Sequence, residues 1–371
     1  MAKRSDEDFF AGKRPWSLIK DQVLKDYMTP YLAKVKILRR PILLIDGYAG
    51  PGVFEDGAEG SPVIICKAAE QLVKGNYQAK FINSEARYHK KLETVIQREG
   101  WSGSAQAIKG DTTALLQTLP GSLKDQTVFL YLDPFGPTGC EFSLLEPFLK
   151  RNRQYSTEIL LTMNMPGMHR FASRYAIEKG RQDEQHIQSH HQIMDKIFGG
   201  EYWRKIMFDE NLNPEEQEMQ LIEQYRLKLA RHLPYTGSCP VREKTDKRIK
   251  YFIVFASRHQ DAMLLLNDIM AKAYFSGMHK ADFVGGLWED IDWREMRVAD
   301  DLDEVILSMV AQYSGQTRKF LWSMIVQQHF MRYLRPEYHT AVRKLLNGKK
   351  LNSPSFSATG KLNDDIQLYL S

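Results

Sequence analysis

The chain has 371 residues, 43% of them hydrophobic and 26% charged, which is the composition of a globular protein and excludes a mainly disordered one. Its 51 lysines and arginines outnumber 46 acidic residues, and a net charge of +5 does not by itself indicate nucleic-acid binding. The three cysteines, Cys66, Cys140 and Cys239, are far apart, which excludes a disulfide framework or an all-cysteine zinc site. Because neither a signal peptide nor a membrane-length apolar run is present, we expect a cytoplasmic protein without membrane association.

The first part of the chain predicts a helix followed by alternating strands and helices. An N-terminal helical segment is expected within residues 1–40, where Pro30 indicates a break or kink. The expected strands after it are Ile42–Ile45, Ala79–Ser84, Ala105–Ile108, Thr127–Leu132 and Glu158–Thr162. The expected helices between them are Ser61–Gly75, with Ser61 as its N-cap, His89–Glu99, Thr112–Leu119 and Leu144–Leu149. This alternation is typical of an α/β, doubly wound, mostly parallel Rossmann-like sheet.

The second half predicts an insertion, a return to the sheet and a separate C-terminal region. Residues 165–245 are polar and helical in pattern, so we expect a helical insertion within a sheet domain over residues 41–294. The sheet is expected to resume with the strand Tyr251–Ala256, the helix Asp261–Phe275 and a last strand at Ala281–Leu287.

A small basic helical domain is expected over residues 295–371, and a winged helix would fit it. Its expected helices are Asp303–Tyr313, Lys319–His329 and Pro336–Leu346. Residues 317–350 hold one acid, Glu337, against eight basic residues: Arg318, Lys319, Arg332, Arg335, Arg343, Lys344, Lys349 and Lys350. This excess predicts contacts to a phosphate backbone, with a merely solvated basic face as the alternative.

A glycine-rich turn follows the first strand. Asp46 ends the strand, and Gly47, Gly50 and Gly52 allow the backbone of the turn to approach a ligand closely. The spacing differs from the dinucleotide fingerprint and from the P-loop, and Pro51 removes one backbone donor. The pattern therefore indicates either a ligand-binding loop of another type or an ordinary turn between a strand and a helix.

Each of the next three strands is also followed by a carboxylate. These residues are Glu85, Asp111 and Asp133. Because the carboxyl ends of parallel strands meet at one edge of a sheet, we expect all three beside Asp46. A carboxylate after the second strand is suited to accept hydrogen bonds from ribose hydroxyls, and one after the third can accept from an exocyclic amine.

This order of residues resembles the class I S-adenosylmethionine-dependent methyltransferases. The segments RPWSLIKDQVLKDYMTPYLAKV, IDGYAGPGVFEDGAEGSP and LYLDPFGPTG are, more narrowly, similar to the three-Cys-motif partner proteins, over essentially the whole chain. The resemblance implies a methyltransferase-type sheet, S-adenosylmethionine as cofactor and a radical-S-adenosylmethionine-like three-Cys-motif protein as partner. It implies cofactor contacts from Asp46, Gly47, Gly50, Gly52, Glu85 and Asp111.

The segment Asp133-Pro134-Phe135-Gly136 is the expected catalytic motif. A carboxylate and the neighbouring backbone carbonyl can accept both hydrogens of an amine, and an aromatic ring can stack on a planar base. The motif is similar to Asp-Pro-Pro-Tyr of amino-methylating DNA enzymes and, more closely, to Asp-Pro-Phe-Gly of tRNA guanine-N2 dimethyltransferases. Pro137, Thr138 and Gly139 depart from that pattern and leave the target open, as does the simpler interpretation of a strand end followed by a turn.

Three further groups predict structural roles. We expect no metal site: His186, His190 and His191 recur at helical spacing but lack a completing carboxylate or cysteine, so they indicate a polar helix face. Trp288, Glu289, Asp290 and Trp293 are expected to close the sheet edge. The N-terminal segment 11–40 carries eight basic residues against two acids and either contacts nucleic acid or forms a solvated face.

Three functions follow from these features. The first is a methyltransferase acting on an amino nitrogen of nucleic acid, with RNA expected before DNA. The second is a metal-dependent nuclease, with the clustered acids holding magnesium, although the glycine turn and Phe135 have no role in it. The third is a non-catalytic partner subunit that retains the methyltransferase fold.

Overall fold

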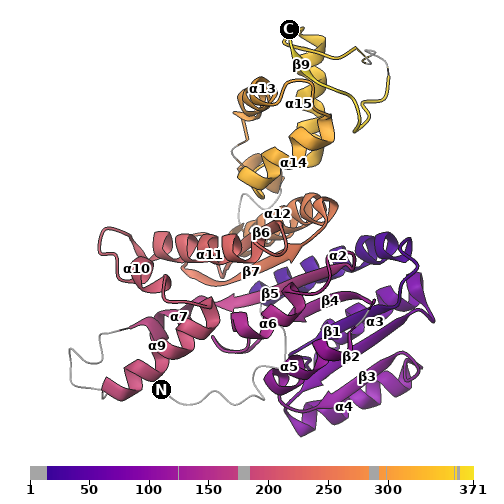
Figure 1. The fold of residues 1–371 in the computed structure, drawn as a ribbon, viewed down its shortest axis with the longest axis vertical. Helices are drawn as coiled ribbons and strands as arrows, with labels where there is room; N and C mark the ends of the chain where they lie inside the picture. The colour runs from indigo at the N-terminus through magenta and orange to yellow at the C-terminus, as the bar shows by residue number, and fades with distance from the viewer. Residues whose placement is uncertain are drawn as a thin grey trace. The chain divides into compact units, whose positions relative to one another are not determined.

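The protein is described here from a computed structural model, which covers residues 15–123, 125–173, 184–283, 292–297, 299–354, 356 and 360–371. The chain forms two compact units, Met1–Arg258 and His259–Ser371 (Figure 1). Within the described ranges no helix combines the length and apolar character needed to cross a membrane.

The first unit is built on one seven-stranded sheet. The strands are β1 (Ile42–Asp46), β2 (Tyr77–Asn83), β3 (Ala105–Lys109), β4 (Thr127–Leu132), β5 (Thr157–Asn164), β6 (Tyr235–Arg242) and β7 (Ile249–Ser257). Their order is β3-β2-β1-β4-β5-β7-β6. β1 to β5 are parallel, and β7 runs antiparallel to both β5 and β6. The predicted α/β fold class, a doubly wound and mostly parallel Rossmann-like sheet, is confirmed.

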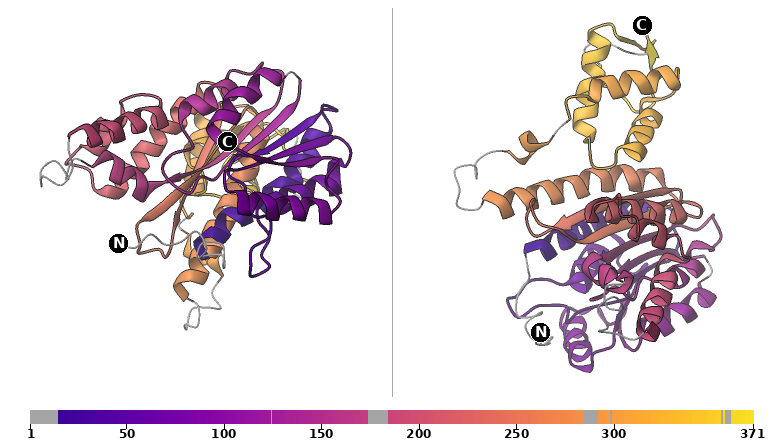
Figure 2. Two further views of the ribbon diagram at one scale, coloured as in Figure 1. Left: turned by 90° about the horizontal axis from the view of Figure 1, so that it is seen from below. Right: turned by 90° about the vertical axis from the view of Figure 1, so that its left-hand side faces the viewer.

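Helices cover both faces of this sheet. They are α2 (Pro15–Lys36), α3 (Ser61–Val73), α4 (Ala86–Arg98), α5 (Thr112–Ser122), α6 (Phe142–Leu149), α7 (Met165–Ala172), α9 (Glu184–Phe198), α10 (Trp203–Met207) and α11 (Pro214–Ala230). The chain moves outward from β1 to β3 and then returns to continue from β4 to β5. Right-handed crossovers in opposite directions place α3 and α4 on one face and α5 and α6 on the other, as Figure 2 shows. The crevice of such a sheet lies where the direction changes, between β1 and β4.

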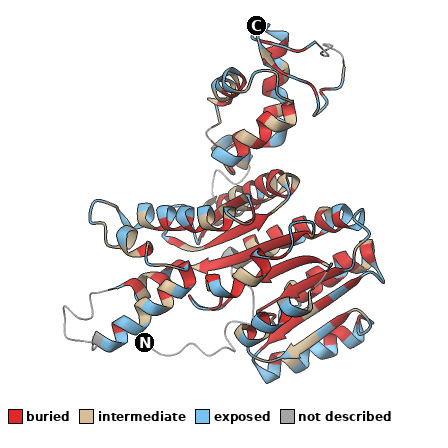
Figure 3. Ribbon diagram, viewed as in Figure 1, coloured by how far each residue is buried: buried red, intermediate tan, exposed pale blue. Residues whose placement is uncertain are grey.

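The core follows from the alternation of side chains along the buried strands. In β4, Val128 and Leu130 belong to a large apolar cluster that also contains residues of α5, α6, α7, α9 and α11. Phe129 points to the opposite face, where its ring lies 5.2 Å from that of Tyr31 of α2. The central strands β1, β4 and β5 are buried on both faces (Figure 3), which requires them to be mainly apolar.

Several elements differ from the sequence expectations. α2 continues through Pro30 without a break, and the N-cap of α3 is Gly60 rather than Ser61. The predicted insertion at 165–245 contains the sheet strand β6, which the sequence did not reveal because Gly237 and Pro240 weaken its strand pattern. Pro240 is tolerated because β6 is an edge strand.

The second unit begins with α12 (Gln260–Phe283) and contains the three predicted C-terminal helices. The remaining elements are η1 (Trp293–Met296), α13 (Leu302–Gln312), α14 (Arg318–Gln328), α15 (Arg335–Asn347), β8 (Leu351–Asn352) and β9 (Tyr369–Leu370). β8 and β9 pair antiparallel. The winged-helix interpretation stays a prediction.

The predicted strand Ala281–Leu287 is wrong over residues 281–283, which continue α12, and its remainder lies outside the described residues. Helix α12 forms here instead of a strand because its buried side chains recur at helical spacing. The buried Asn267 of α12 donates to the carbonyl of Tyr333 at 2.8 Å and accepts from the amide of Met331 at 2.7 Å. These bonds join α12 to the turn between α14 and α15, so this unit starts well before residue 295.

Candidate functional site

Asp46 organises the loop at the start of the crevice. Its buried carboxylate accepts hydrogen bonds from the Ser61 hydroxyl at 2.6 Å and from the Tyr48 amide at 3.0 Å. Burial raises the pKa of Asp46 to about 7, although these two hydrogen bonds oppose the shift. Asp46 thus ties the glycine-rich loop to the first residue of α3, and its carboxylate acts inside the protein rather than toward a ligand.

Two glycines of the loop are required by its geometry. A Cβ atom on Gly47 would lie 2.5 Å from the Leu132 side chain and 3.1 Å from that of Thr112, so a larger residue would require these side chains to shift. Gly52 has a φ of +85°, a conformation that other residues rarely adopt. Gly50 lies between them and is half-buried. The loop therefore passes close to the sheet edge and is mostly buried, with only Tyr48 and Gly50 partly exposed.

Polar neighbours of the next two acids bind this loop directly. The Asn83 amide donates to the carbonyl of Ala49 at 2.5 Å and accepts from the backbone amide of Glu85 at 2.8 Å. The Thr112 hydroxyl donates to the carbonyl of Gly47. Asn83 and Thr112 consequently hold the ends of β2 and β3 against the loop that follows β1.

Glu85 and Asp111 are both exposed beside that loop. The Glu85 side chain forms no hydrogen bond or ion pair within the described part of the chain, so its carboxylate is available to a ligand. Asp111 uses one carboxylate oxygen to accept from the amide of Ala114 at 2.9 Å, which caps α5. The structure therefore brings both predicted acids to the same edge as Asp46.

Asp133 follows β4 at the opposite side of the crevice and has a partner on each carboxylate oxygen. The Thr162 hydroxyl of β5 donates to Oδ1 at 2.6 Å, and the Lys20 ammonium of α2 donates to Oδ2. Burial lowers the pKa of Lys20, but the attraction of Asp133, with smaller contributions from Asp21 and Asp46, raises it above its usual value. Asp133 is thus held as the partner of a charged lysine.

The residues that follow Asp133 form a loop in which one aromatic side chain, that of Phe135, is exposed to solvent. Pro134 is buried and Gly136 is half-buried, whereas 62% of the Phe135 surface is exposed. The Tyr48 hydroxyl donates to the carbonyl of Gly139 at 2.9 Å, which fixes the far end of this loop to the glycine-rich loop. Phe135 is therefore presented at the surface by a backbone that is held from both ends.

Sequence reasoning missed the roles of Lys20 and Thr162. Lys20 is one of the eight basic residues of the N-terminal segment 11–40, but the periodicity of a helix does not reveal which strand end each side chain reaches. Thr162 lies beside Asp133 because β5 pairs with β4 in register, Leu161 opposite Leu132. Threonine is so common in strands that the sequence holds no signal for this contact.

The histidines of α9 pack against aromatic rings. The His190 ring stacks on Phe171 with centroids 4.5 Å apart, and the His191 ring lies 5.1 Å from Trp203. Among the residues that the structure describes, no group of three or more histidines, cysteines and carboxylates is arranged to hold a metal ion. Residues 288–290, expected at the sheet edge, lie outside the described residues.

The comparisons with known proteins identify no family. No family model matches the sequence, and no curated protein matches it. Among solved structures, the O-methyltransferase from Bacillus cereus in complex with SAH is 12% identical, with a TM-score of 0.34, covering 67% of this chain and 94% of that chain.

Two further solved structures have similar values. A methyltransferase from Geobacter sulfurreducens is 12% identical, with a TM-score of 0.24, and covers 44% of this chain and 66% of that chain. Geranyl diphosphate methyltransferase in complex with SAM is 11% identical, with a TM-score of 0.25, and covers 58% and 77% of the respective chains. These TM-scores are low, so the fold assignment rests on the strand order and not on these likenesses.

Proposed function

We propose that the protein binds S-adenosylmethionine in the crevice between β1 and β4 and transfers its methyl group to an amino nitrogen of RNA. The observation that supports this most is the joining of three strand ends through Asn83 and Thr112. It leaves Glu85 and Asp111 exposed beside a glycine-rich loop that is itself partly exposed at Gly50. These are the groups that an adenosine with a charged tail requires: acceptors for ribose hydroxyls and for the adenine amine.

Each part of the site has a distinct role in this proposal. Glu85 accepts hydrogen bonds from the ribose, and the loop around Gly50 and Gly52 contacts the remainder of the cofactor. S-adenosylmethionine supplies an electrophilic methyl group when it is bound. Asp133 accepts a hydrogen of the target amine with the lone pairs that Lys20 and Thr162 leave available, and Phe135 stacks on the base. Positioning of the two reactants then contributes most of the acceleration.

A hydroxyl or an acidic ring nitrogen is a second candidate for the methylated atom, because Lys20 contacts Asp133. An amine gains positive charge as it is methylated, and a neighbouring ammonium opposes that charge. A nucleophile that loses its proton is instead stabilised by an ammonium. The charge of Lys20 therefore distinguishes the two target types.

The other interpretations are weaker. A magnesium-dependent nuclease requires several acids on one ion, but within the described ranges the four acids do not form such a group, and Asp46 is directed inward. A role as partner of a three-Cys-motif radical-S-adenosylmethionine-like protein, with or without catalysis, stays part of the proposal because the sequence resembles that partner family.

The proposal is tested by titrating the protein with S-adenosylmethionine in a calorimeter. Glu85→Ala removes charge-assisted hydrogen bonds of about 1.5–3 kcal/mol, so its Kd for the cofactor should rise roughly tenfold or more. Glu93→Ala removes an exposed carboxylate from helix α4, whose N-cap residue is Glu85, and should leave that Kd unchanged. If the unaltered protein binds no cofactor, the proposed function is wrong; if both variants bind it equally well, the role of Glu85 is wrong.

A further inference from the structure

A basic cavity lies next to the loop that carries the candidate catalytic motif. The cavity has a volume of about 290 Å³, near the lower end of the roughly 300–1,000 Å³ typical of ligand pockets. It is formed where the start of α6, the end of α9 and the end of α11 meet. Residues that line it include Phe142, Ser143, Lys196, Lys228, Arg231 and His232.

The positive charges of this cavity are poorly neutralised. Neither Lys196 nor Arg231 has a carboxylate partner within the part of the chain that the structure describes. Lys228 donates to the carbonyl of Gly199 and lies 4.5 Å from the centroid of the Phe142 ring. Burial lowers the pKa of Lys228, and the like charge of Arg231 lowers it further. An anion in the cavity would relieve this repulsion.

The one acid that lines the cavity neutralises these charges only in part, since Glu146 attracts Lys228 and opposes the lowering of its pKa. Glu146 already pairs with Lys150 at 2.9 Å, and both side chains are largely exposed to solvent. Lys196 and Arg231 supply an ammonium and a guanidinium without a carboxylate partner in the described ranges, and Lys228 supplies a second ammonium. Phosphate oxygens are the acceptors that such a set of donors suits best.

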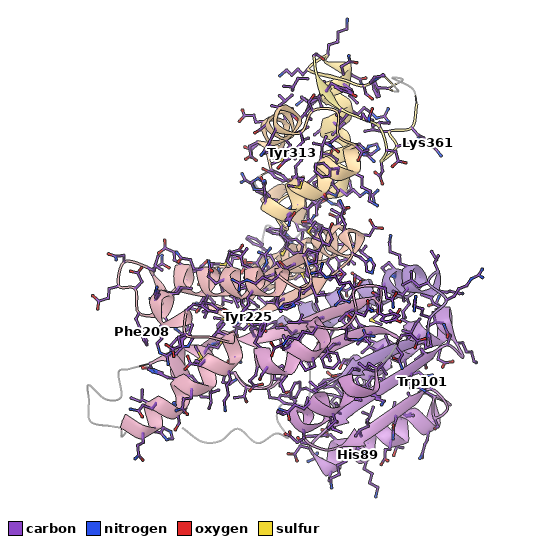
Figure 4. The ribbon with its side chains drawn as sticks, viewed as in Figure 1. His89, Trp101, Phe208, Tyr225, Tyr313 and Lys361 are labelled. Carbon is purple, nitrogen blue, oxygen red and sulfur yellow. The ribbon has the colours of Figure 1, made fainter. Side chains whose placement is uncertain are left out.

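The cavity and the loop that carries the candidate catalytic motif are both in contact with helix α11. α6 begins at Phe142, seven residues after Phe135, so the two are separated by at most about 25 Å of extended chain. Tyr225 of α11, labelled in Figure 4, donates its hydroxyl to the carbonyl of Cys140 at 3.4 Å and packs edge-on against Phe142 at 6.2 Å. One turn further along α11 is Lys228. The loop and the cavity are consequently fixed to the same helix.

We propose that this cavity binds a backbone phosphate of the RNA whose target base stacks on Phe135. The inference rests on the proposed function, since it assigns one contact of that same substrate. The RNA would then be held at two points, with its target base on Phe135 and a phosphate a few nucleotides away in the cavity. The loop that carries the motif lies between these two points. The cavity thereby sets where along the strand the enzyme binds, independently of base identity.

The test measures binding of a labelled single-stranded RNA of mixed sequence over a range of salt concentrations. The double variant Lys196→Ala/Arg231→Ala should weaken binding several-fold and reduce the slope of log affinity against log salt by about 1 or more. The matched control Lys90→Ala/Arg153→Ala removes an exposed lysine and an exposed arginine from elsewhere in the same unit, neither of which has a carboxylate partner within the described ranges. It should change both quantities less.

Equal losses in the two double variants would overturn the proposal, because the cavity would then add only diffuse charge. RNA binding that is unchanged in the cavity variant, while binding of inorganic phosphate is lost, would assign the cavity to a free anion and also overturn it. Titration with S-adenosylmethionine in the same samples separates this inference from the proposed function, since the cavity variant should bind the cofactor normally.

Discussion

Two uncharged residues, Asn83 and Thr112, assemble the candidate site at the scale of single side chains. Both bind backbone carbonyls of the glycine-rich loop and hold the neighbouring acids in place. The acids divide into two kinds as a result. Asp46 is buried and structural, whereas Glu85 and Asp111 are exposed and available. Asp133 belongs to neither kind, because it is partly exposed but already paired with Lys20.

Asp133→Asn should separate binding from catalysis. The carboxylate acts on the target and not on the cofactor in the proposed mechanism, so Kd for S-adenosylmethionine should remain nearly unchanged. Turnover of RNA methylation should fall on the order of 10²-fold, because a preorganised negative partner of the developing charge is lost. Transfer of a labelled methyl group measures this, with Thr138→Ala in the same loop as control. Full turnover in Asp133→Asn would exclude the catalytic role.

Lys20→Met tests which kind of atom is methylated. With an amine as target, removal of the ammonium leaves the Asp133 charge more effective, so turnover should stay within about threefold of the unaltered protein or increase. With a hydroxyl or acidic ring nitrogen as target, turnover should instead fall about tenfold or more, and Lys20→Arg should restore it in part. Measurement of kcat for the three proteins decides between these outcomes, and the second would contradict the proposed amine target.

At the scale of elements, helix α2 connects the candidate site with a buried carboxylate inside the sheet. Lys20 of this helix reaches Asp133, and Tyr27, two turns later, donates its hydroxyl to Glu158 of β5. Glu158 also accepts from the Ser257 hydroxyl of β7 at 3.2 Å. One buried carboxylate therefore links α2, β5 and β7. The position of Lys20 depends on this attachment, because a helix is rigid over two turns.

Burial of Glu158 should make the stability of the protein depend on pH. Burial raises the pKa of Glu158 from 4.5 to about 7 in the folded state. As pH rises from about 4.5, the unfolded chain loses this proton first, so the stability contributed by Glu158 decreases until about pH 7, at about 1.4 kcal/mol per unit of pKa difference. Glu158→Gln has no titrating group; its amide oxygen can accept from one of the two hydroxyls, and its NH2 group can donate to the oxygen of the other. Its melting temperature should therefore fall less over this interval.

The control for this prediction is Glu146→Gln. Glu146 is largely exposed, and its hydrogen bond to Lys150 lowers its pKa, which is the opposite direction. This variant should retain the full decrease in melting temperature between about pH 4.5 and about pH 7. Identical pH profiles for the unaltered protein and Glu158→Gln would show that Glu158 is not the responsible group. Asp46, whose pKa is also raised by burial, contributes a decrease of the same sign in all three proteins.

At the scale of the whole molecule, a count of charges within residues 317–350 overstates the positive charge that this segment has available for a ligand. The count over residues 317–350 included eight basic residues and one acid. Five of these basic residues pair with acids outside that range: Arg318 and Arg335 with Asp364, Arg332 with Asp301, Lys344 with Asp303 and Lys319 with Asp261. Arg343 donates to the carbonyl of Gly360 at 3.1 Å. Binding of a phosphate backbone by this segment stays a prediction with less charge to support it.

The sequence by itself determined the sheet and the acids at its edge. The strands β1, β4 and β5 are buried on both faces and therefore appear in the sequence as mainly apolar runs. The end of each strand is marked by the change from apolar to polar residues. Glu85, Asp111 and Asp133 follow from that order alone, because parallel strands deliver their ends to one edge.

Only the tertiary structure decided what those acids can do. Lys20 reaches Asp133 across 113 positions of sequence, and the pairing of Asp46 with Ser61 removes that carboxylate from any ligand. The tertiary structure was also needed to identify β6 as a strand of the sheet and to locate the start of the second unit. It was needed as well to find the basic cavity beside α6, because the residues that line it come from separate parts of the chain. Periodicity reports which face of an element is apolar, but contacts between elements depend on how those faces pack, and packing depends on all of them at once.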